Sequence, residues 1–296
     1  MKTDYVVSGS LNRPIRFSEY KADNEICKLI IIHGMQEHSG RYEETAKSFN
    51  DKNISVITFD LRGHGSNQPV RAGYDDGDIY LNIVADCKAI IAKVVEMAGD
   101  KKVFVLGHSF GSFVTQRLIK DRVKGVAGYV LSGSTKFCGV VPAFGRVVAR
   151  LQKIFKGGKS DAKLIEKLSF GAYSKGFEDG NWLTRDNDVW EKYQADPLCG
   201  QVFPVSFYYS MFKNVPKNYS RLKNKVGYCP NILVLSGTKD PVGGYTNGVK
   251  KLYNVYASAG FNANIKLFDD CRHECLNELN KAEVIGTIVE YIRSLV

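Results

Sequence analysis

The pentapeptide GHSFG, residues 107–111, holds a serine in a setting that favours nucleophilic chemistry. An apolar run, VFVL, leads into it, and an amphipathic stretch, SFVTQRLIKD, follows it at once. The pattern G-x-S-x-G between a strand and a helix predicts a strained turn that exposes Ser109 above a sheet, while Gly107 and Gly111 let strand and helix approach closely. The alternative is an ordinary helix N-cap serine, which this context disfavours.

The base and the acid that such a serine needs are expected later in the chain. Asp240 follows the apolar run NILVLS, and His273 follows IKLF, so each comes just after a predicted strand. The order serine, aspartate, histidine is the one expected for this strand–turn–helix nucleophile. Asp269 and Asp270 compete for the role of the acid, but adjacent loop carboxylates are usually solvated. The other four histidines precede Ser109 in glycine motifs or loops, where we expect them to order the backbone.

Acyl transfer also needs hydrogen-bond donors aimed at the oxyanion that develops on the substrate. We expect one to be the backbone N–H of Phe110, the residue after the nucleophile. The second is expected in the loop after the third strand, where Gly34 lets the backbone turn so that the N–H of Met35 points into the site. Both residues would act through backbone atoms.

The seven cysteines are scattered and odd in number, which favours free thiols in a reducing compartment over a disulfide framework. Cys271 and Cys275 flank His273, but no second pair of ligands accompanies them, so no metal site is predicted. The chemistry requires no cofactor. The first residues lack the apolar run of a signal peptide, and no stretch approaches 18 unbroken apolar residues. We therefore expect a cytoplasmic protein.

The segments around these residues alternate between strand and helix. Such alternation predicts right-handed βαβ units and a mostly parallel, doubly wound sheet buried on both faces. A hairpin is expected near the start, at residues 5–8 and 14–20. The further strands are expected at 28–33, 54–60, 102–107, 126–132, 231–236 and 264–268, and helices at 41–52, 79–98, 109–120, 245–259 and 276–295.

Residues 135–228 break this alternation and predict a mainly helical cap inserted into a core of residues 1–134 and 229–296. The cap segment carries 16 Lys/Arg against 8 Asp/Glu, a net +8, whereas the rest of the chain, with 25 against 23, carries +2. A basic surface layer that aids solubility explains this charge, and attraction to anionic lipid or substrate is the second interpretation. No recognised nucleic-acid module accompanies the charge, so no nucleic-acid partner is expected.

Five sequence blocks together resemble the monoacylglycerol lipase-like and lysophospholipase-like α/β-hydrolases, a group also described as serine aminopeptidase S33-like. The resemblance implies the α/β-hydrolase fold, the triad Ser109–Asp240–His273 and an oxyanion hole at Met35 and Phe110. It also implies that the second block shapes a loop near the site without acting chemically. The blocks are HGMQEHSGRY (33–42), DLRGHGSN (60–67), GHSFG (107–111), SGTKDPVGG (236–244) and RHECLNE (272–278).

The cap offers two indications of the substrate. Residues 141–159 predict a basic amphipathic helix, which either lies on an anionic membrane or packs its apolar side onto the protein. The segment FPVSFYYSMF, 203–212, either lines an apolar tunnel above Ser109 or packs within the cap. The side chains expected in such a tunnel are Phe203, Phe207, Tyr208, Met211 and Phe212.

Together these indications favour hydrolysis of a small lipid ester, such as a monoacylglycerol or a lysophospholipid. A peptidase or amidase would share every catalytic residue. An acyltransferase would use the same acyl-enzyme, and a binding protein on this fold would carry a disabled triad. The oligomeric state does not follow from the sequence.

Overall fold

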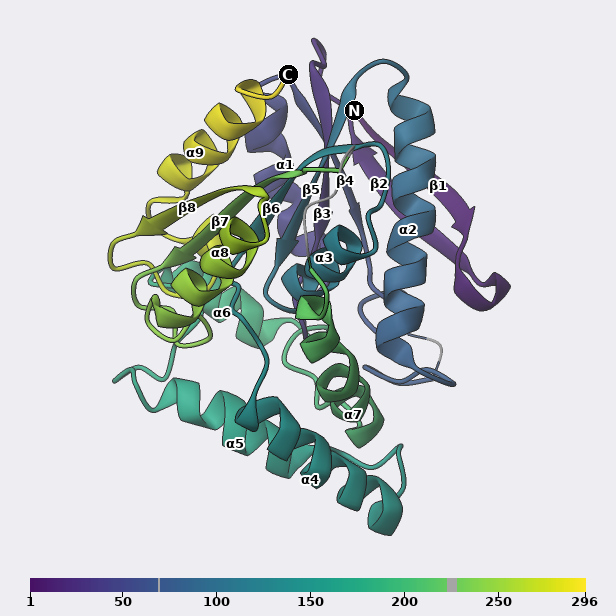
Figure 1. Ribbon diagram of the computed structural model, residues 1–296, viewed down its shortest axis with the longest axis vertical. Coiled ribbons are helices and arrows are strands. Elements are labelled where there is room, and N and C mark those ends of the chain that lie inside the picture. Colours follow the sequence, from purple (N-terminus) through teal and green to yellow (C-terminus); the bar gives the residue numbers. More distant parts are fainter. Residues whose placement is uncertain (69, 223–227) are drawn as a thin grey trace.

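One sheet organises the molecule in the computed structural model, which describes residues 1–68, 70–222 and 228–296. Its strands are hydrogen-bonded in the order β1-β2-β4-β3-β5-β6-β7-β8 (Figure 1). The strands are β1 (Lys2–Ser8), β2 (Pro14–Tyr20), β3 (Cys27–Ile32), β4 (Ile54–Phe59), β5 (Lys102–His108), β6 (Val126–Ser132), β7 (Asn231–Gly237) and β8 (Asn262–Phe268).

The strands from β3 onward run parallel, and the first two form an antiparallel hairpin on β4. Every residue of β3 and of β4 is buried, as expected for central strands covered on both faces. The edge strand β8 instead alternates between exposed and partly buried residues. The mostly parallel, doubly wound sheet predicted from the apolar runs is confirmed.

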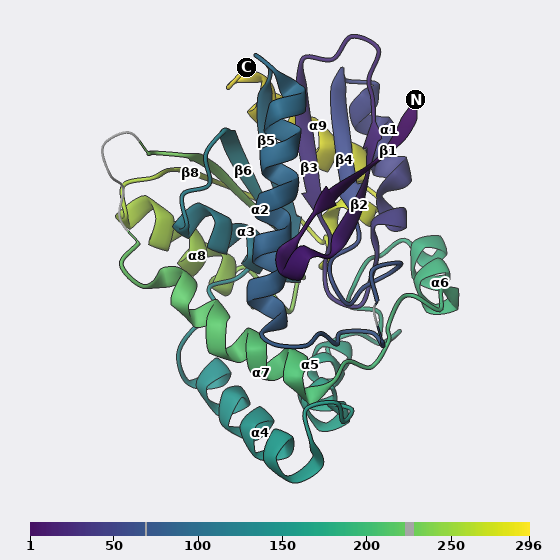
Figure 2. The same ribbon diagram turned by 90° about the vertical axis from the view of Figure 1, so that its right-hand side faces the viewer.

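Helices cover both faces of the sheet and create two separate apolar clusters (Figure 2). Residues of α2 (Ile79–Ala98), α3 (Phe110–Lys120) and α8 (Asn247–Ser258) belong to one cluster. Residues of α1 (Glu43–Asn50) and α9 (Lys281–Arg293) belong to the other. Alternate residues of β3 supply the two clusters, Ile30 and Ile32 the first and Leu29 and Ile31 the second.

The insertion, residues 135–228 between β6 and β7, adds α4 (Val140–Lys156), α5 (Lys163–Ser174), α6 (Asn187–Ala195), α7 (Val205–Asn214) and the 3-10 helix η3 (Val215–Tyr219). Figures 1 and 2 place α4 and α5 farthest from the sheet, with α7 between them and the rest of the molecule. Buried residues of α7 extend the cluster that lies under α2 and α3. The division into a core and a separate cap stays a prediction.

Two differences from the sequence-based expectations concern helices. The last helix starts at Lys281 rather than at 276, because the carboxylate of Glu278 holds the preceding loop by accepting hydrogen bonds from the backbone N–H groups of Arg272 and Arg185. Only part of the apolar side of α4 packs onto the protein: Ala149 is buried, whereas Val147, Leu151 and Ile154 are 55%, 49% and 65% exposed. None of the helices in the described ranges is both long and apolar enough to cross a membrane.

Candidate active site

Ser109 occupies a strained turn between β5 and α3. Its backbone lies at φ 50° and ψ −117°, a conformation that non-glycine residues adopt only where the surroundings enforce it. The glycines on either side are required by close packing. A Cβ on Gly107 would lie 2.3 Å from Oγ1 of Thr115, and one on Gly111 would lie 2.1 Å from the backbone O of Ile32. The predicted strand–turn–helix context of Ser109 is therefore present.

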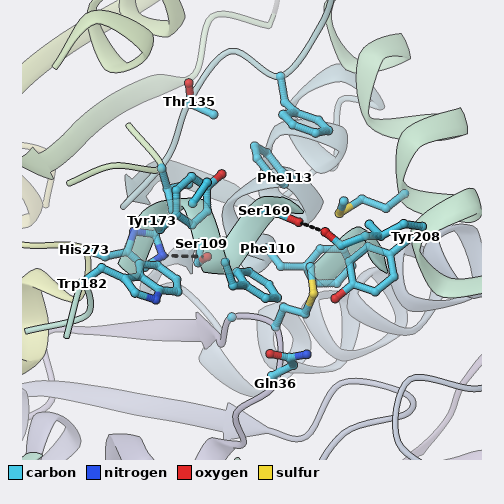
Figure 3. Close-up of a pocket in the computed structure, with 18 of the residues that line it drawn as sticks. Gln36, Ser109, Phe110, Phe113, Thr135, Ser169, Tyr173, Trp182, Tyr208 and His273 are labelled. Atoms are coloured by element: carbon cyan, nitrogen blue, oxygen red, sulfur yellow. Dashed lines mark hydrogen bonds between the residues drawn. The ribbon is translucent and has the colours of Figure 1, made fainter. Parts of the chain in front are cut away.

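The three residues predicted as a triad lie in one hydrogen-bonded line, of which Figure 3 shows the part between Ser109 and His273. Nε2 of His273 is 2.9 Å from Oγ of Ser109, and Nδ1 of His273 is 3.0 Å from Oδ1 of Asp240. The second carboxylate oxygen of Asp240 accepts a hydrogen bond from Oγ of Ser236 at 2.8 Å. The competing acids Asp269 and Asp270 are exposed.

Burial and neighbouring charges shift the pKa values of Asp240 and His273 in opposite directions. Burial alone would raise the pKa of Asp240, but the charge and hydrogen bond of His273, together with the Ser236 hydroxyl, hold that pKa below its ordinary value. For His273, burial would lower the pKa, whereas Asp240 and then Glu274 and Glu37 raise it above its ordinary value. The arrangement therefore strengthens the imidazole as a base while keeping the acid ionised.

The other buried histidines are weak bases by comparison. Burial lowers the pKa of His108 to about 4 and that of His64 to about 3, and it also lowers the pKa of His33. His33 orders the backbone, because its Nε2 accepts from the N–H of Leu61 at 2.9 Å. This contact agrees with the expectation that His33 orders the loop backbone.

The loop after β3 reaches the nucleophile. A Cβ built on Gly34 would lie 3.2 Å from Cβ of Ser109, and Gly34, Met35, Ser109 and Phe110 all border one cavity. The two predicted oxyanion donors therefore flank Ser109, one from the loop and one from the first residue of α3. Their assignment as donors stays a prediction.

Sequence reasoning missed a buried charge cluster. It joins the loop after β3 to the loop of His273, the segment 269–280 between β8 and α9. Arg41 donates to Glu37 at 2.6 Å and to both carboxylate oxygens of Glu274 at 2.9 and 2.7 Å. Burial would raise the pKa of Glu274, but Arg41 lowers it to about 2. The signal was present in the sequence, since all three charged residues fall inside the blocks 33–42 and 272–278.

A cavity of about 490 Å³ opens above Ser109, and most of its wall is apolar. Of the side chains expected to line a tunnel, Tyr208, Met211 and Phe212 do so. Phe203 and Phe207 lie outside this wall, and their rings contact each other and His64 beneath it. The structure thus assigns these two residues to packing rather than to the cavity.

Trp182 forms a wall beside His273 that the sequence did not predict (Figure 3). Its ring centroid is 5.1 Å from that of His273, and it stacks on Phe170. The backbone O of Leu183 accepts from the N–H of Glu274 at 2.7 Å, and Arg272 lies over the ring of Phe177. Residues 177–185 are thereby fastened to the loop of His273.

One group in the described ranges has the donor types of a metal site: His38, Asp196 and Cys199. Nδ1 of His38 accepts from the N–H of Gly40, so Nε2 carries the proton that it donates to Asp196 at 2.8 Å. Burial raises the pKa of Cys199 to about 12, which keeps its thiol protonated. In this form the group is a hydrogen-bonded contact between the loop after β3 and the insertion.

Comparisons with known proteins agree with this geometry. Residues 24–280 match the model of the family described as Serine aminopeptidase, S33. A monoglyceride lipase homolog of Monkeypox virus is 24% identical over 255 residues, which cover 86% of this chain and 84% of the viral protein. Phospholipase YtpA of Bacillus subtilis is 25% identical over 269 residues, covering 90% and 94% of the two chains.

Among solved structures, a thermostable carboxyl esterase from Bacillus coagulans shares the fold with a TM-score of 0.86 at 21% identity, over 99% of this chain and 98% of its own. The family match spans both flanks of the insertion and includes Ser109, Asp240 and His273. The chain therefore belongs to the serine aminopeptidase S33 family of α/β-hydrolases.

Proposed function

We propose that the protein is a serine hydrolase that cleaves carboxylic esters of lipids, in particular monoacylglycerols or lysophospholipids. The observation that carries this proposal is the hydrogen-bonded line from Ser109 through His273 to Asp240, which opens into a largely apolar cavity. A membership in the S33 family supports hydrolysis, and the printed names of two relatives, a monoglyceride lipase homolog and a phospholipase, support a lipid ester.

The reaction proceeds in two halves. Nε2 of His273 takes the proton of Ser109 while Oγ attacks the ester carbonyl, and the N–H groups of Met35 and Phe110 hold the oxyanion. When the tetrahedral intermediate collapses, the C–O bond to the alcohol breaks and His273 gives its proton to the leaving oxygen. Water then attacks the acyl-enzyme by the same route and releases the fatty acid and Ser109.

The apolar lining of the cavity supports a substrate with a long apolar chain. α4, α5 and α7 each contribute to its wall, through side chains such as Val148, Leu168 and Met211. Phe144 borders the cavity and is also 64% exposed, so the apolar wall continues onto the outer surface of α4.

The same surface supports contact with an anionic membrane. Arg146, Arg150, Lys153 and Lys156 are exposed on α4 beside its exposed apolar side chains. A helix with this distribution binds lipid interfaces through buried apolar area and attraction to anionic headgroups. Membrane contact would bring the mouth of the cavity to the surface that holds the substrate.

The experiment that tests the proposal is hydrolysis by Ser109→Ala and by the wild type. We expect the variant to lose about 10⁵-fold or more in kcat on p-nitrophenyl esters, to fold normally and to escape labelling by a fluorophosphonate. Turnover by the variant at the wild-type rate would refute the role of Ser109.

The substrate class is tested separately on the wild-type protein. Monoacylglycerols, lysophospholipids and esters of graded chain length are compared with matched amides. We expect kcat/KM to rise with chain length until the cavity is filled. A preference for amides would replace the lipid proposal by a peptidase, and transfer of the acyl group to added glycerol would indicate an acyltransferase.

A further inference from the structure

The backbone around Met35 is held from both sides. On the N-terminal side, the N–H of Gly34 donates to Oε1 of Glu37 at 2.5 Å. On the C-terminal side, Gln36 lies in the left-handed region, at φ 59°, and is only 8% exposed. This region is strained for a non-glycine residue, so the surroundings must stabilise it.

Gln36 is held by the insertion. Its Nε2 donates to Oε1 of Glu166 on α5 at 2.8 Å. Its backbone O accepts from the N–H of Gly200 at 2.9 Å and from the hydroxyl of Tyr193 at 3.2 Å. Three hydrogen bonds therefore join the insertion to the residue that follows Met35.

Glu166 also connects the parts of the insertion to one another. The oxygen that accepts from Gln36 accepts from the N–H of Phe203 and from the hydroxyl of Tyr208, each at 2.9 Å. Figure 3 shows Gln36 and Tyr208 on the side of Phe110, away from His273 and Trp182. This carboxylate thus lies where α5, α7 and the loop after β3 meet.

We propose that Glu166 is a positioning residue of the reaction, which sets the direction of the Met35 N–H through Gln36. The inference rests on the proposed function, in which this N–H stabilises the oxyanion. Because peptide groups are planar, fixing Gly34 and Gln36 leaves the two peptide groups on either side of Met35 little freedom. The insertion is then part of the catalytic machinery and not only a cover over the substrate.

Loss of this support has a defined kinetic signature. In Glu166→Ala the side chain of Gln36 loses its acceptor, and its backbone can relax away from the left-handed region. A misdirected donor acts only on the transition state, so kcat falls while KM stays within about 3-fold of the wild type. We expect a loss of about 10- to 100-fold in kcat, less than removal of an oxyanion donor costs.

Three variants separate positioning from a general effect on folding. Glu166→Gln keeps an oxygen that accepts all three hydrogen bonds and should retain most of the wild-type kcat. Gln36→Ala removes the partner and should lose as much as Glu166→Ala. In the double variant the two losses should not multiply, because both act through one hydrogen bond. Glu191→Ala, an exposed glutamate of α6, is the matched control and should leave kcat unchanged.

A transition-state analogue provides the second readout. An alkyl trifluoromethyl ketone adds to Ser109 and places an oxyanion in the hole, so its affinity should fall in parallel with kcat/KM in Glu166→Ala. Wild-type kcat in Glu166→Ala, or multiplying losses in the double variant, would overturn the inference. If Glu166→Ala does not fold, Gln36→Ala alone decides by the same two readouts. The proposed function fails independently, through retained turnover in Ser109→Ala.

Discussion

Two regions of the insertion meet the active site in opposite ways. Residues 177–185 are fastened to the loop of His273 by Arg272, by the backbone O of Leu183 and by the ion pair between Arg185 and Glu278 at 2.9 Å. Helix α4, on the other side of the cavity, buries only Pro142 and Ala149 completely and exposes most of its apolar side chains.

The difference indicates two tasks within one insertion. The fastened region holds the groups that must keep sub-ångström geometry during proton transfer, and such groups need a rigid surrounding. The exposed helix is held mainly along one side, where Ala149 and Val148 pack towards α7, and part of its apolar surface borders the cavity where a lipid chain would enter. The predictions below disturb first the buried charges beside His273, where residues 177–185 are held, and then α4.

The largest effect is expected at Arg41, which connects Glu37 in the loop after β3 to Glu274, the neighbour of His273. Arg41→Ala leaves two buried carboxylates without their cation. Removing one partner of a buried pair costs about 3–5 kcal/mol of unfolding free energy. Urea denaturation at pH 7 measures this loss. The control, Lys47→Ala, removes an exposed cation from α1 and should cost less than about 1 kcal/mol.

The cost of Arg41→Ala should depend on pH. In the wild type the pKa of Glu274 is lowered to about 2, so its stabilising contribution is present above the unfolded pKa of about 4.3 and is lost as pH falls towards 2. The wild type and the variant should therefore converge in stability between about pH 5 and pH 2. A constant difference across this range would contradict the assigned pairing.

A smaller effect is expected when the charge next to the base is removed. Glu274 raises the pKa of His273, and Glu274→Gln removes that negative charge while keeping the side-chain shape. Activity requires neutral His273, so kcat/KM of the wild type should rise with pH through a pKa above 6.5. In Glu274→Gln this acid limb should move to lower pH. The pH profile of p-nitrophenyl ester hydrolysis measures the shift.

Other titratable groups also lie near His273, so the control variant must change a glutamate that is not among them. Asp240 contributes more to the raised pKa than Glu274, and Glu37 contributes less. His108 lies with its ring centroid 4.9 Å away but is held neutral by burial. Glu283→Gln, an exposed glutamate of α9, should leave the acid limb in place. A limb that moves to higher pH in Glu274→Gln would contradict the electrostatic explanation.

The parts that sequence reasoning could predict are those with a local signal. β6 and α2 match their predicted bounds, because a buried strand and a long amphipathic helix each carry a clear apolar period. The order of the three triad candidates and their positions after strands also follow from motifs. Arg41 and Glu274 also stand in motif blocks, but their pairing does not follow from the sequence, because the fold brings together residues 233 positions apart. The exposure of α4 does not follow from the sequence either, because an amphipathic pattern does not show whether another part of the protein covers the apolar side.

The exposed face of α4 is the last test, and its effect on the folded state should be the smallest. Val147, Leu151 and Ile154 are exposed and lie outside the cavity wall. Replacing all three by serine should change the unfolding free energy by less than about 0.5 kcal/mol per site, as surface substitutions do. Hydrolysis of a short, soluble ester should stay within about 2-fold of the wild type, because the cavity and the triad are untouched.

In this triple serine variant only binding to a lipid surface, and hydrolysis of substrate within it, should decrease. We expect it to bind less to vesicles of anionic phospholipid and to hydrolyse monoacylglycerol within them more slowly, since the apolar area that enters the interface is lost. Val6→Ser, on the exposed face of β1 away from α4, is the control and should leave both measurements unchanged. Equal vesicle binding by the triple variant and the wild type would contradict a membrane role. α4 would then be a cavity wall whose outer face serves another purpose.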